Sequence, residues 1–428
     1  MTRKAVAGRL LCFRNGPENP VYLERGFLVI EGGRIVAMGD DPAIAAGLDI
    51  EDYGEHLVMP GFVDTHLHYP QTQVIGSYGA QLLEWLQRYT FVEEQRFADA
   101  DHAARVARFF FDELLRNGTT TACVYCTSHP GSVDAFFAES ERRGTAMIAG
   151  KVMMDRGAPE GLLDTPERGY SESRALIERW HGKGRQLYAI TPRFAVTSSE
   201  AQLEATAALL REHPDCYLQT HLSENRQEIA TIAELFPWSK NYTDVYDHYG
   251  LLGERSIFGH CIHLGSEERK RLAETGSIAA FCPTSNLFIG SGLFDRAALK
   301  ADGVVVTLAS DIGGGTSYSM LCTAAEGYKV LQLQGQNFPA FDMFHTMTAG
   351  NAEALGLADE VGTLAPGSMA DFIVLDSSAT PAMAHRMEAV RREDPLERLA
   401  EELFILVTMA DDRAVKATWI AGECRHKA

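Results

Sequence analysis

Histidine and carboxylate side chains recur in this sequence in a pattern that is typical of a metal site. His66 and His68 form an H-x-H in the strand-like segment over residues 60–68. Side chains two apart on a strand share a face, so both imidazoles can bind one ion. An H-x-H alone does not separate a metal site from two incidental histidines.

Three later β-rich runs also end in candidate ligands or proton-transfer groups. His221 ends one run and is followed by Glu224, His260 ends another, and Asp311 follows a third. Three histidines and an aspartate offer the nitrogen and oxygen donors that zinc accepts, with one position left for water. Because coincidence at four run ends is improbable, we predict a metal centre where these ends meet.

The ligand-bearing runs must lie side by side for these groups to meet. Between residues 57 and 311, β-rich runs alternate with amphipathic helical stretches, which favours parallel strands joined by helices. Eight such runs in about 250 residues match a (β/α)₈ barrel, whose active sites lie at the C-terminal mouth. We therefore predict an α/β TIM-type barrel over residues 61–360, with strands at 58–66, 119–125, 146–153, 187–194, 216–221, 256–260, 277–281 and 304–308.

The two ends of the chain differ from this alternation. Residues 1–60 and 361–428 contain short strand-like pieces with glycine turns. We predict that both ends form one small β-sandwich-like domain. The segment over residues 379–403 is rich in charge and helix formers, and we expect a helical excursion there.

Composition narrows the class of protein. The chain has 428 residues, is 46% hydrophobic and carries a formal net charge of -19. An acidic protein repels polyanions, so we expect a small-molecule substrate and no nucleic-acid partner. The N-terminus lacks the apolar core of a signal peptide, and no apolar run approaches the roughly 20 residues of a membrane span. We expect a cytoplasmic protein without a membrane partner.

Eight cysteines are scattered along the chain, and we expect free thiols. Cys123 and Cys126 form a C-x-x-C inside a strand-like run. No second cysteine pair lies near it, so buried thiols are favoured over a redox or zinc role.

Five segments resemble the amidohydrolase superfamily, and within it the branch that deaminates guanine. The H-x-H and the final aspartate are shared by many hydrolases, whereas Gln71 and the Arg193-Phe194 pair are the narrower indicators. The resemblance covers nearly the whole chain and is carried by residues 60–71, 150–155, 191–194, 221–225 and 317–320.

The resemblance implies a hydrolytic deaminase with one metal ion per subunit, zinc or alternatively iron. The implied ligands are His66, His68, His221 and Asp311. Asp311 would take a proton from the attacking water, and Glu224 would protonate the purine ring at N3. His260 would contact the substrate or the attacking water, as a catalytic and binding residue. A homodimer is also implied.

Gln71, Arg193 and Phe194 are the implied substrate-binding residues. Arg193 can donate two hydrogen bonds to the O6 and N7 edge of guanine, and Gln71 offers a donor and an acceptor to the opposite edge. Phe194 either flanks the purine ring or belongs to the core, and the sequence favours neither reading.

Several features depart from related metal sites. Binuclear amidohydrolases place a lysine at the end of the fourth strand, where this chain has Arg193-Phe194, so we expect one metal. Lys151 lies on the third strand, and we expect a structural ion pair. The P-C-x-x-C motif of the other large deaminase class is absent. Four histidines have no place in the motif and are expected to be structural or at the surface: His56, His129, His263 and His345.

Two alternatives stay open. Metal ligands do not specify the leaving group, so the substrate could be another purine or a triazine ring. A rival of a different class is a barrel that has lost its chemistry, against which the intact ligand set and Glu224 argue.

Overall fold

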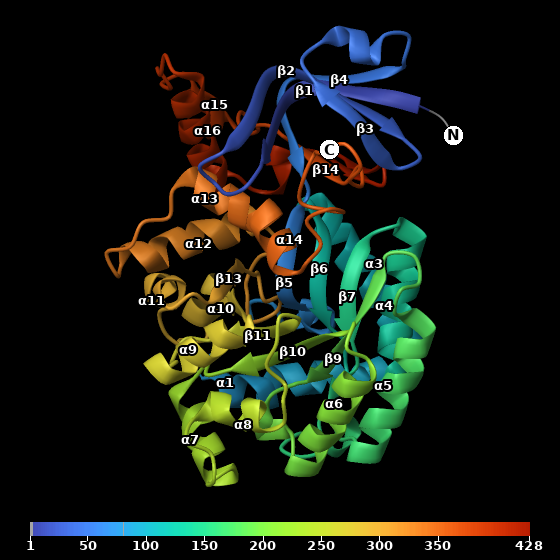
Figure 1. Ribbon diagram of the computed structural model, residues 1–428, viewed down its shortest axis with the longest axis vertical. Coiled ribbons are helices and arrows are strands. Elements are labelled where there is room, and N and C mark those ends of the chain that lie inside the picture. Colours follow the sequence, from blue (N-terminus) through green and yellow to red (C-terminus); the bar gives the residue numbers. More distant parts are fainter. Residues whose placement is uncertain (1–2, 80) are drawn as a thin grey trace.

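The computed structural model describes residues 3–79 and 81–428, which form a barrel of parallel strands and a second sheet (Figure 1). The barrel strands run in the order β13-β12-β11-β10-β9-β7-β6-β5, and β8 pairs with β9. The predicted α/β barrel is therefore confirmed. The strands are β5 (Phe62–His68), β6 (Thr119–Tyr125), β7 (Ala146–Gly150), β8 (Val152–Met153), β9 (Gln186–Pro192), β10 (Tyr217–Leu222), β11 (Ser256–His260), β12 (Ile278–Phe281) and β13 (Val305–Leu308).

Helices connect the barrel strands and cover them from outside (Figure 1). They are α1 (Leu82–Trp85), α2 (Phe91–Glu94), α3 (Ala100–Arg116), α4 (Pro130–Arg143), α5 (Pro166–Trp180), α6 (Glu200–Glu212), α7 (Arg226–Leu235), α8 (Tyr242–His248), α9 (Ser266–Thr275), α10 (Pro283–Phe288), α11 (Arg296–Ala301), α12 (Met320–Gln332), α13 (Ala340–His345) and α14 (Asn351–Ala354). The helix α3 begins after Asp99, whose carboxylate accepts from the Asp101 N–H, and ends before Gly118, whose positive φ of 81° suits glycine.

Both termini build the second sheet, as predicted. Its order is β16-β15-β14-β4-β1-β2-β3, with α15 (Pro381–Met387) and α16 (Pro395–Met409) inserted before β15. The helical excursion predicted at residues 379–403 is thereby confirmed. The boundaries at 60/61 and 360/361 stay predictions. The strands are β1 (Arg3–Phe13), β2 (Pro20–Glu31), β3 (Arg34–Gly39), β4 (Ile50–Pro60), β14 (Phe372–Leu375), β15 (Val415–Ile420) and β16 (Glu423–Lys427).

The strand predicted at residues 58–66 is divided between the two sheets. β4 ends at Pro60 and β5 begins at Phe62, with Gly61 between them. A Cβ on Gly61 would collide with the side chain of Thr120, and the Gly61 N–H donates to Asp371 O (3.1 Å). The chain therefore passes from one sheet to the other at a residue that must lack a side chain.

The barrel core is apolar on both faces of its strands. On β6, Ala122 and Val124 pack with Phe110 of α3, whereas Cys123 faces the barrel interior. Alternation of this kind is expected of parallel strands that are covered on both sides. Cys123 and Cys126 are free, buried thiols, as predicted.

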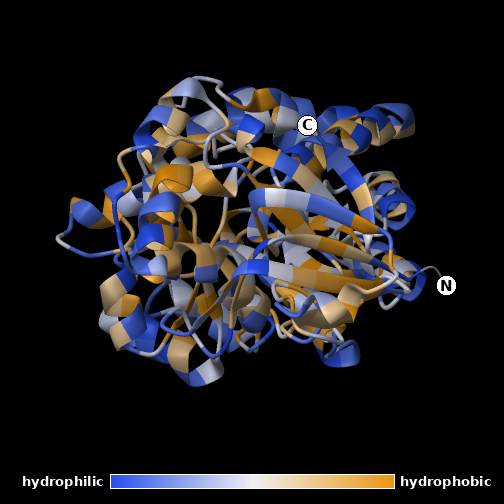
Figure 2. Cartoon of the chain, turned by 90° about the horizontal axis from the view of Figure 1, so that it is seen from above, coloured by the Kyte–Doolittle hydropathy of each residue, from blue (hydrophilic) through white to orange (hydrophobic). Residues whose placement is uncertain are grey.

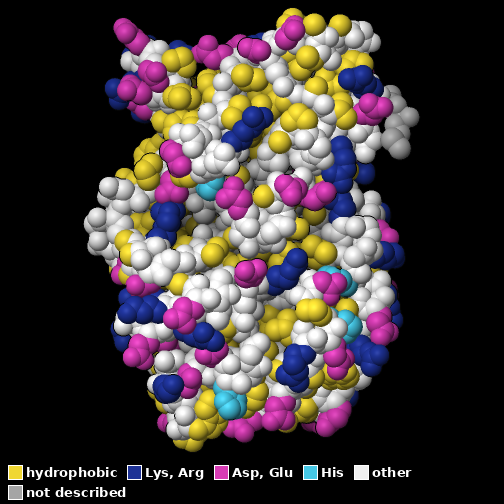
Figure 3. All heavy atoms as spheres, viewed as in Figure 1, with side chains coloured by type: hydrophobic (Ala, Val, Ile, Leu, Met, Phe, Trp, Pro, Cys, Tyr) yellow, Lys and Arg dark blue, Asp and Glu magenta, His cyan; other side chains and the backbone are white. Residues whose placement is uncertain are grey.

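The surface is polar and carries both charges. Figure 2 shows hydrophobic residues along the strands and hydrophilic residues on the outer faces of the helices. Acidic and basic side chains are interspersed over the face in Figure 3. Among the described residues, no helix combines the length and the apolar character needed to cross a bilayer.

The seam between the first and last barrel strands is bridged by side chains. The Asn351 amide donates to Val63 O (2.7 Å) on β5 and to Leu308 O (2.8 Å) on β13, and its oxygen accepts from the Leu308 N–H (3.1 Å). The Thr65 hydroxyl also donates to the Thr307 hydroxyl (2.8 Å). These bonds satisfy backbone groups where the ladder of strands ends.

Replacing Asn351 by leucine should loosen this seam. Asn351→Leu keeps much of the volume but leaves buried backbone groups without partners, which costs about 3 kcal/mol in total. We expect the apparent midpoint of thermal unfolding, followed by circular dichroism, to fall by several degrees. Asn337→Leu, at an exposed position, is the control. Equal midpoints in the two variants would contradict the role of Asn351.

Candidate metal centre and substrate pocket

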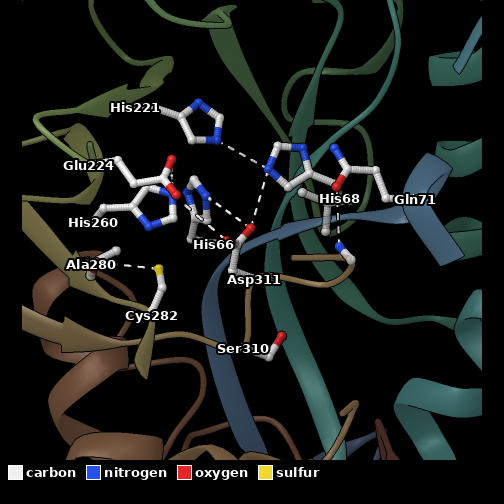
Figure 4. A network of polar contacts seen from close by, with 12 residues as sticks. His66, His68, Gln71, His221, Glu224, His260, Ala280, Cys282, Ser310 and Asp311 are labelled. Carbon is white, nitrogen blue, oxygen red and sulfur yellow. Dashed lines mark hydrogen bonds and ion pairs between the residues drawn. The ribbon is translucent and has the colours of Figure 1, made fainter. Parts of the chain in front are cut away.

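The four predicted metal ligands converge at the C-terminal mouth of the barrel (Figure 4). His66 and His68 come from β5, His221 from β10, and Asp311 follows β13. Asp311 Oδ1 lies 3.4 Å from His66 Nε2 and 3.4 Å from His68 Nε2. His221 Nε2 lies 3.2 Å from His68 Nε2. Tetrahedral ligands about 2.0–2.1 Å from a zinc ion are roughly 3.4 Å apart, so the spacing suits one such ion.

Burial and neighbouring groups set the protonation states of these four side chains. Burial lowers the pKa of His66, lowers that of His68 to about 3 and lowers that of His221 well below its usual value. Burial alone would raise the pKa of Asp311, but the interactions with His66 and His68 outweigh it and hold the pKa well below its usual value. Neutral imidazoles with one carboxylate are the donors that a divalent cation accepts.

The orientation of the histidines also fits a cation. The His221 Nδ1–H donates to Arg193 O (2.6 Å), which leaves the Nε2 lone pair directed at the site. Within residues 3–79 and 81–428, His66 Nδ1, His66 Nε2 and His68 Nδ1 are buried and have no hydrogen-bond partner. Buried polar atoms are rarely left in this state, and coordination would satisfy His66 Nε2, which faces Asp311.

Glu224 and His260 lie beside the ligands. His260 Nε2 is 3.4 Å from Glu224 Oε2 and 3.7 Å from Asp311 Oδ2, so its ring stands between the two carboxylates. Burial and the charge of Asp311 raise the pKa of Glu224 to about 8. A carboxyl group with that pKa is mostly protonated at neutral pH and can donate a proton.

Two residues that sequence reasoning missed hold this pair in place. Asn286 Oδ1 accepts from the His260 Nδ1–H (2.8 Å), and the Ser291 hydroxyl donates to Glu224 Oε1 (2.9 Å). His263 Nε2 in turn contacts Ser291 O (2.9 Å). Both residues follow the seventh barrel strand, β12, and the sequence there carries no recognisable signal for these contacts.

The backbone at three strand ends is left-handed. Ser223, His260 and Asp311 have φ values of 51°, 70° and 52°. This region is uncommon for residues other than glycine, and each such residue costs of order 1 kcal/mol. The turn at Ser223 separates His221 from Glu224, so both side chains can face the site.

A pocket opens on three of the predicted metal ligands, His68, His221 and Asp311. Apolar walls come from Leu82, Trp85, Leu86, Phe194 and Ile289, and a polar part comes from Gln71 and Arg193. Phe194 is 4% exposed and belongs to an apolar cluster that also lines the pocket, so it is a core residue that reaches the pocket wall.

A buried carboxylate joins the two predicted polar binding residues. Glu94 accepts from Arg193 Nη1 at both oxygens (2.9 and 2.8 Å) and from Gln71 Nε2 (3.0 Å). Because both donors meet at Glu94 Oε1, they lie on one side of the pocket. This arrangement favours contacts with neighbouring atoms of a ligand over the opposite edges expected from sequence. Nothing in the sequence around Glu94 marked it as part of a site.

The remaining predicted residues lie elsewhere. Lys151 forms the expected buried ion pairs, with Asp164 and with Glu172 (3.4 Å). None of the four histidines that were set aside lines the described part of the pocket: His56, His129, His263 and His345.

Comparison with known proteins agrees with this architecture. The Amidohydrolase family matches residues 57–425. A guanine deaminase of Escherichia coli (strain K12) is 46% identical over 98% of this chain and 97% of its own. The crystal structure of guanine deaminase from Bradyrhizobium japonicum matches this fold with a TM-score of 0.97 over 100% of each chain. The two sequences are 33% identical.

A third structure carries a ligand. Guanine deaminase from C. acetobutylicum, with guanine bound in its active site, is 26% identical with a TM-score of 0.90, and the match covers 99% of this chain and 100% of that one. The family match covers most of the sequence, and the barrel carries the predicted ligands at its strand ends. This chain belongs to the amidohydrolase family.

Proposed function

We propose that this protein hydrolyses guanine to xanthine and ammonia with the help of one divalent metal ion. The observation that carries the proposal is a single pocket that joins three of the four converging ligands, His68, His221 and Asp311, to the donor groups of Gln71 and Arg193. Similarity to guanine deaminases over nearly the whole chain supports the choice of substrate.

We infer that His66, His68, His221 and Asp311 hold the cation, which is zinc or, alternatively, iron. Imidazole and carboxylate ligands suit both metals. A divalent cation held there would lower the pKa of water to about 7 and so supply a nucleophile at neutral pH.

Two carboxyl groups would move the protons. Asp311 Oδ2 faces away from His66 and His68 and toward His260, so it can take the proton of the attacking water as oxygen adds to C2 of guanine. Burial raises the pKa of Glu224 and so favours its protonated form, and Oε2 is the oxygen not bound by Ser291. That oxygen would give its proton to N3. Asp311 would then pass the proton it took from water to the exocyclic nitrogen, so that the C2–N bond breaks and ammonia leaves. Glu224 would take the remaining hydroxyl proton as the C2 carbonyl of xanthine forms, which returns both carboxyl groups to their starting states.

His260 would hold the developing charge on the attacking oxygen by donating from Nε2, which requires a proton on both ring nitrogens because Nδ1–H is donated to Asn286. The bond from Nδ1 to Asn286 fixes the ring, so that Nε2 points between Glu224 and Asp311. A ring held in this way needs no rearrangement when charge develops.

Arg193 and Gln71 would hold the polar edge of the purine, and Phe194 would flank its ring. The guanidinium of Arg193 is 3% exposed and stacks on Phe91, 5.2 Å from the ring centroid. We also infer a homodimer, from the resemblance alone, and a cytoplasmic location.

Replacing Glu224 by glutamine should separate proton transfer from metal binding. Glu224→Gln keeps the size of the side chain and removes the transferable proton. We expect the variant to retain its metal and to lose about 100-fold or more in kcat, as general-acid loss does. The control is Glu234→Gln, at an exposed position. Normal turnover of guanine by Glu224→Gln would rule out the assigned proton donor.

Metal removal should abolish the activity reversibly. Dialysis against dipicolinate is expected to lower guanine turnover at least about 100-fold, and zinc or iron should restore it. His221→Ala should purify with little metal, whereas His385→Ala, whose side chain is 88% exposed, should not differ from the unmodified protein. Metal content is measured by plasma mass spectrometry. A stripped preparation that still deaminates guanine would refute the proposal.

A panel of rings tests the substrate against its alternatives. Ammonia release is measured with guanine, adenine, adenosine, an oxidised purine and an amino-triazine. We expect guanine to have the highest kcat/KM, because Arg193 and Gln71 offer donors to the purine edge. Equal or better turnover of another ring would transfer the assignment to that ring, and release from none of them would support a barrel without chemistry.

A further inference from the structure

Glu94 is the last residue of α2 and is fully buried. Its carboxylate contacts the two polar side chains that line the pocket next to the metal ligands. Both Glu94 oxygens accept from Arg193 Nη1, and Oε1 also accepts from Gln71 Nε2. In the part of the chain that the structure describes, Glu94 has no other side-chain hydrogen bond.

We propose that Glu94 is a positioning residue that makes Gln71 and Arg193 present N–H donors to the pocket. The pocket thereby selects a purine with a carbonyl oxygen over one with an amine at the same position. The inference rests on the proposed function for the identity of the ligand.

The first step concerns Gln71. A carboxylate only accepts hydrogen bonds, so the Gln71 amide must turn its NH₂ group toward Glu94. Gln71 Oε1 then accepts from the Gly313 N–H (3.3 Å). Both ends of the amide are therefore assigned by fixed partners, and one N–H of Nε2 is left for a ligand.

The second step concerns Arg193. Nη1 is engaged by both oxygens of Glu94, which leaves Nε and Nη2, and these atoms can only donate. The ion pair also neutralises a guanidinium that is 3% exposed, and the ring of Phe91 holds its plane. Glu94 thus presents donors from both residues on one side of the pocket.

The third step concerns the ligand. Donors pair with a carbonyl oxygen or an unprotonated ring nitrogen, whereas an exocyclic amine there would place donor against donor. A site built to pair with a polar group rejects an analogue that leaves the site unpaired. Guanine and 2,6-diaminopurine carry the same reacting 2-amine and differ at C6 and in the proton on N1, so their comparison probes this edge.

The test compares the two purines in Glu94→Gln. Glutamine at this position can donate as well as accept, so Gln71 can turn over and Arg193 loses its counter-charge. We expect the ratio of kcat/KM for guanine to that for 2,6-diaminopurine to fall about tenfold or more, mainly through a higher KM for guanine. A purely structural role would lower both activities together and leave the ratio unchanged.

Two variants serve as matched controls. Glu93→Gln makes the same change one residue earlier, where the carboxylate pairs with Arg96 (2.7 Å) and His102 (3.1 Å) outside the pocket, and should keep the ratio. Glu94→Asp keeps a charged group that only accepts, and its ratio should stay closer to that of the unmodified protein than the ratio of Glu94→Gln does.

Binding separates this inference from the proposed reaction. Dissociation constants for both purines are measured by calorimetry on the metal-loaded protein with Glu224→Gln as background. If the unmodified protein released no ammonia from guanine, the proposed reaction would fail, but the ratio of dissociation constants would still test Glu94. If Glu94→Gln does not fold, the same ratio is measured in Gln71→Met. This variant keeps the Glu94–Arg193 pair but removes the Gln71 donor, so the ratio must also fall. An unchanged ratio in the folded variant overturns the inference.

Discussion

Three neutral imidazoles and one carboxylate face one another in a buried space, and the rest of the structure depends on this convergence. The ligands come from residues as far apart as His66 and Asp311, yet His66 Nε2 and Asp311 Oδ1 are 3.4 Å apart. Only parallel strands that end at one mouth bring such residues together. The left-handed backbone at Ser223, His260 and Asp311 serves the same convergence, because it turns side chains inward where regular geometry would not.

Arg193 links the metal centre to the substrate pocket. Its carbonyl accepts from His221 Nδ1 and so orients a proposed metal ligand, while its guanidinium is held by Glu94 at the polar side of the pocket. One residue therefore sets the geometry of both parts of the site. A displacement of its backbone would disturb the ligand and the binding edge together.

The sequence predicts the barrel and the ligand positions because both follow from local patterns. Alternating β-rich and helical runs give the architecture, and histidines at run ends give the convergence. Glu94, Asn286, Ser291 and Asn351 could not be found this way, because their roles exist only through partners distant in sequence. Asn351, for example, bonds to Val63, 288 residues earlier. The division at Gly61 was missed for the same reason, since its cause is the side chain of Thr120.

The side chain of Asn351, which bridges the first and last barrel strands, is synthesised after both of them, and this affects folding during translation. A nascent chain has made all the barrel strands by Leu308, but the amide that bridges β5 and β13 belongs to Asn351, 43 residues later. β4 likewise gains its neighbour β14 only when Phe372 has been made. Until then the emerging protein has unpaired strand edges, so ribosome-bound chains are exposed to misassembly over most of their translation.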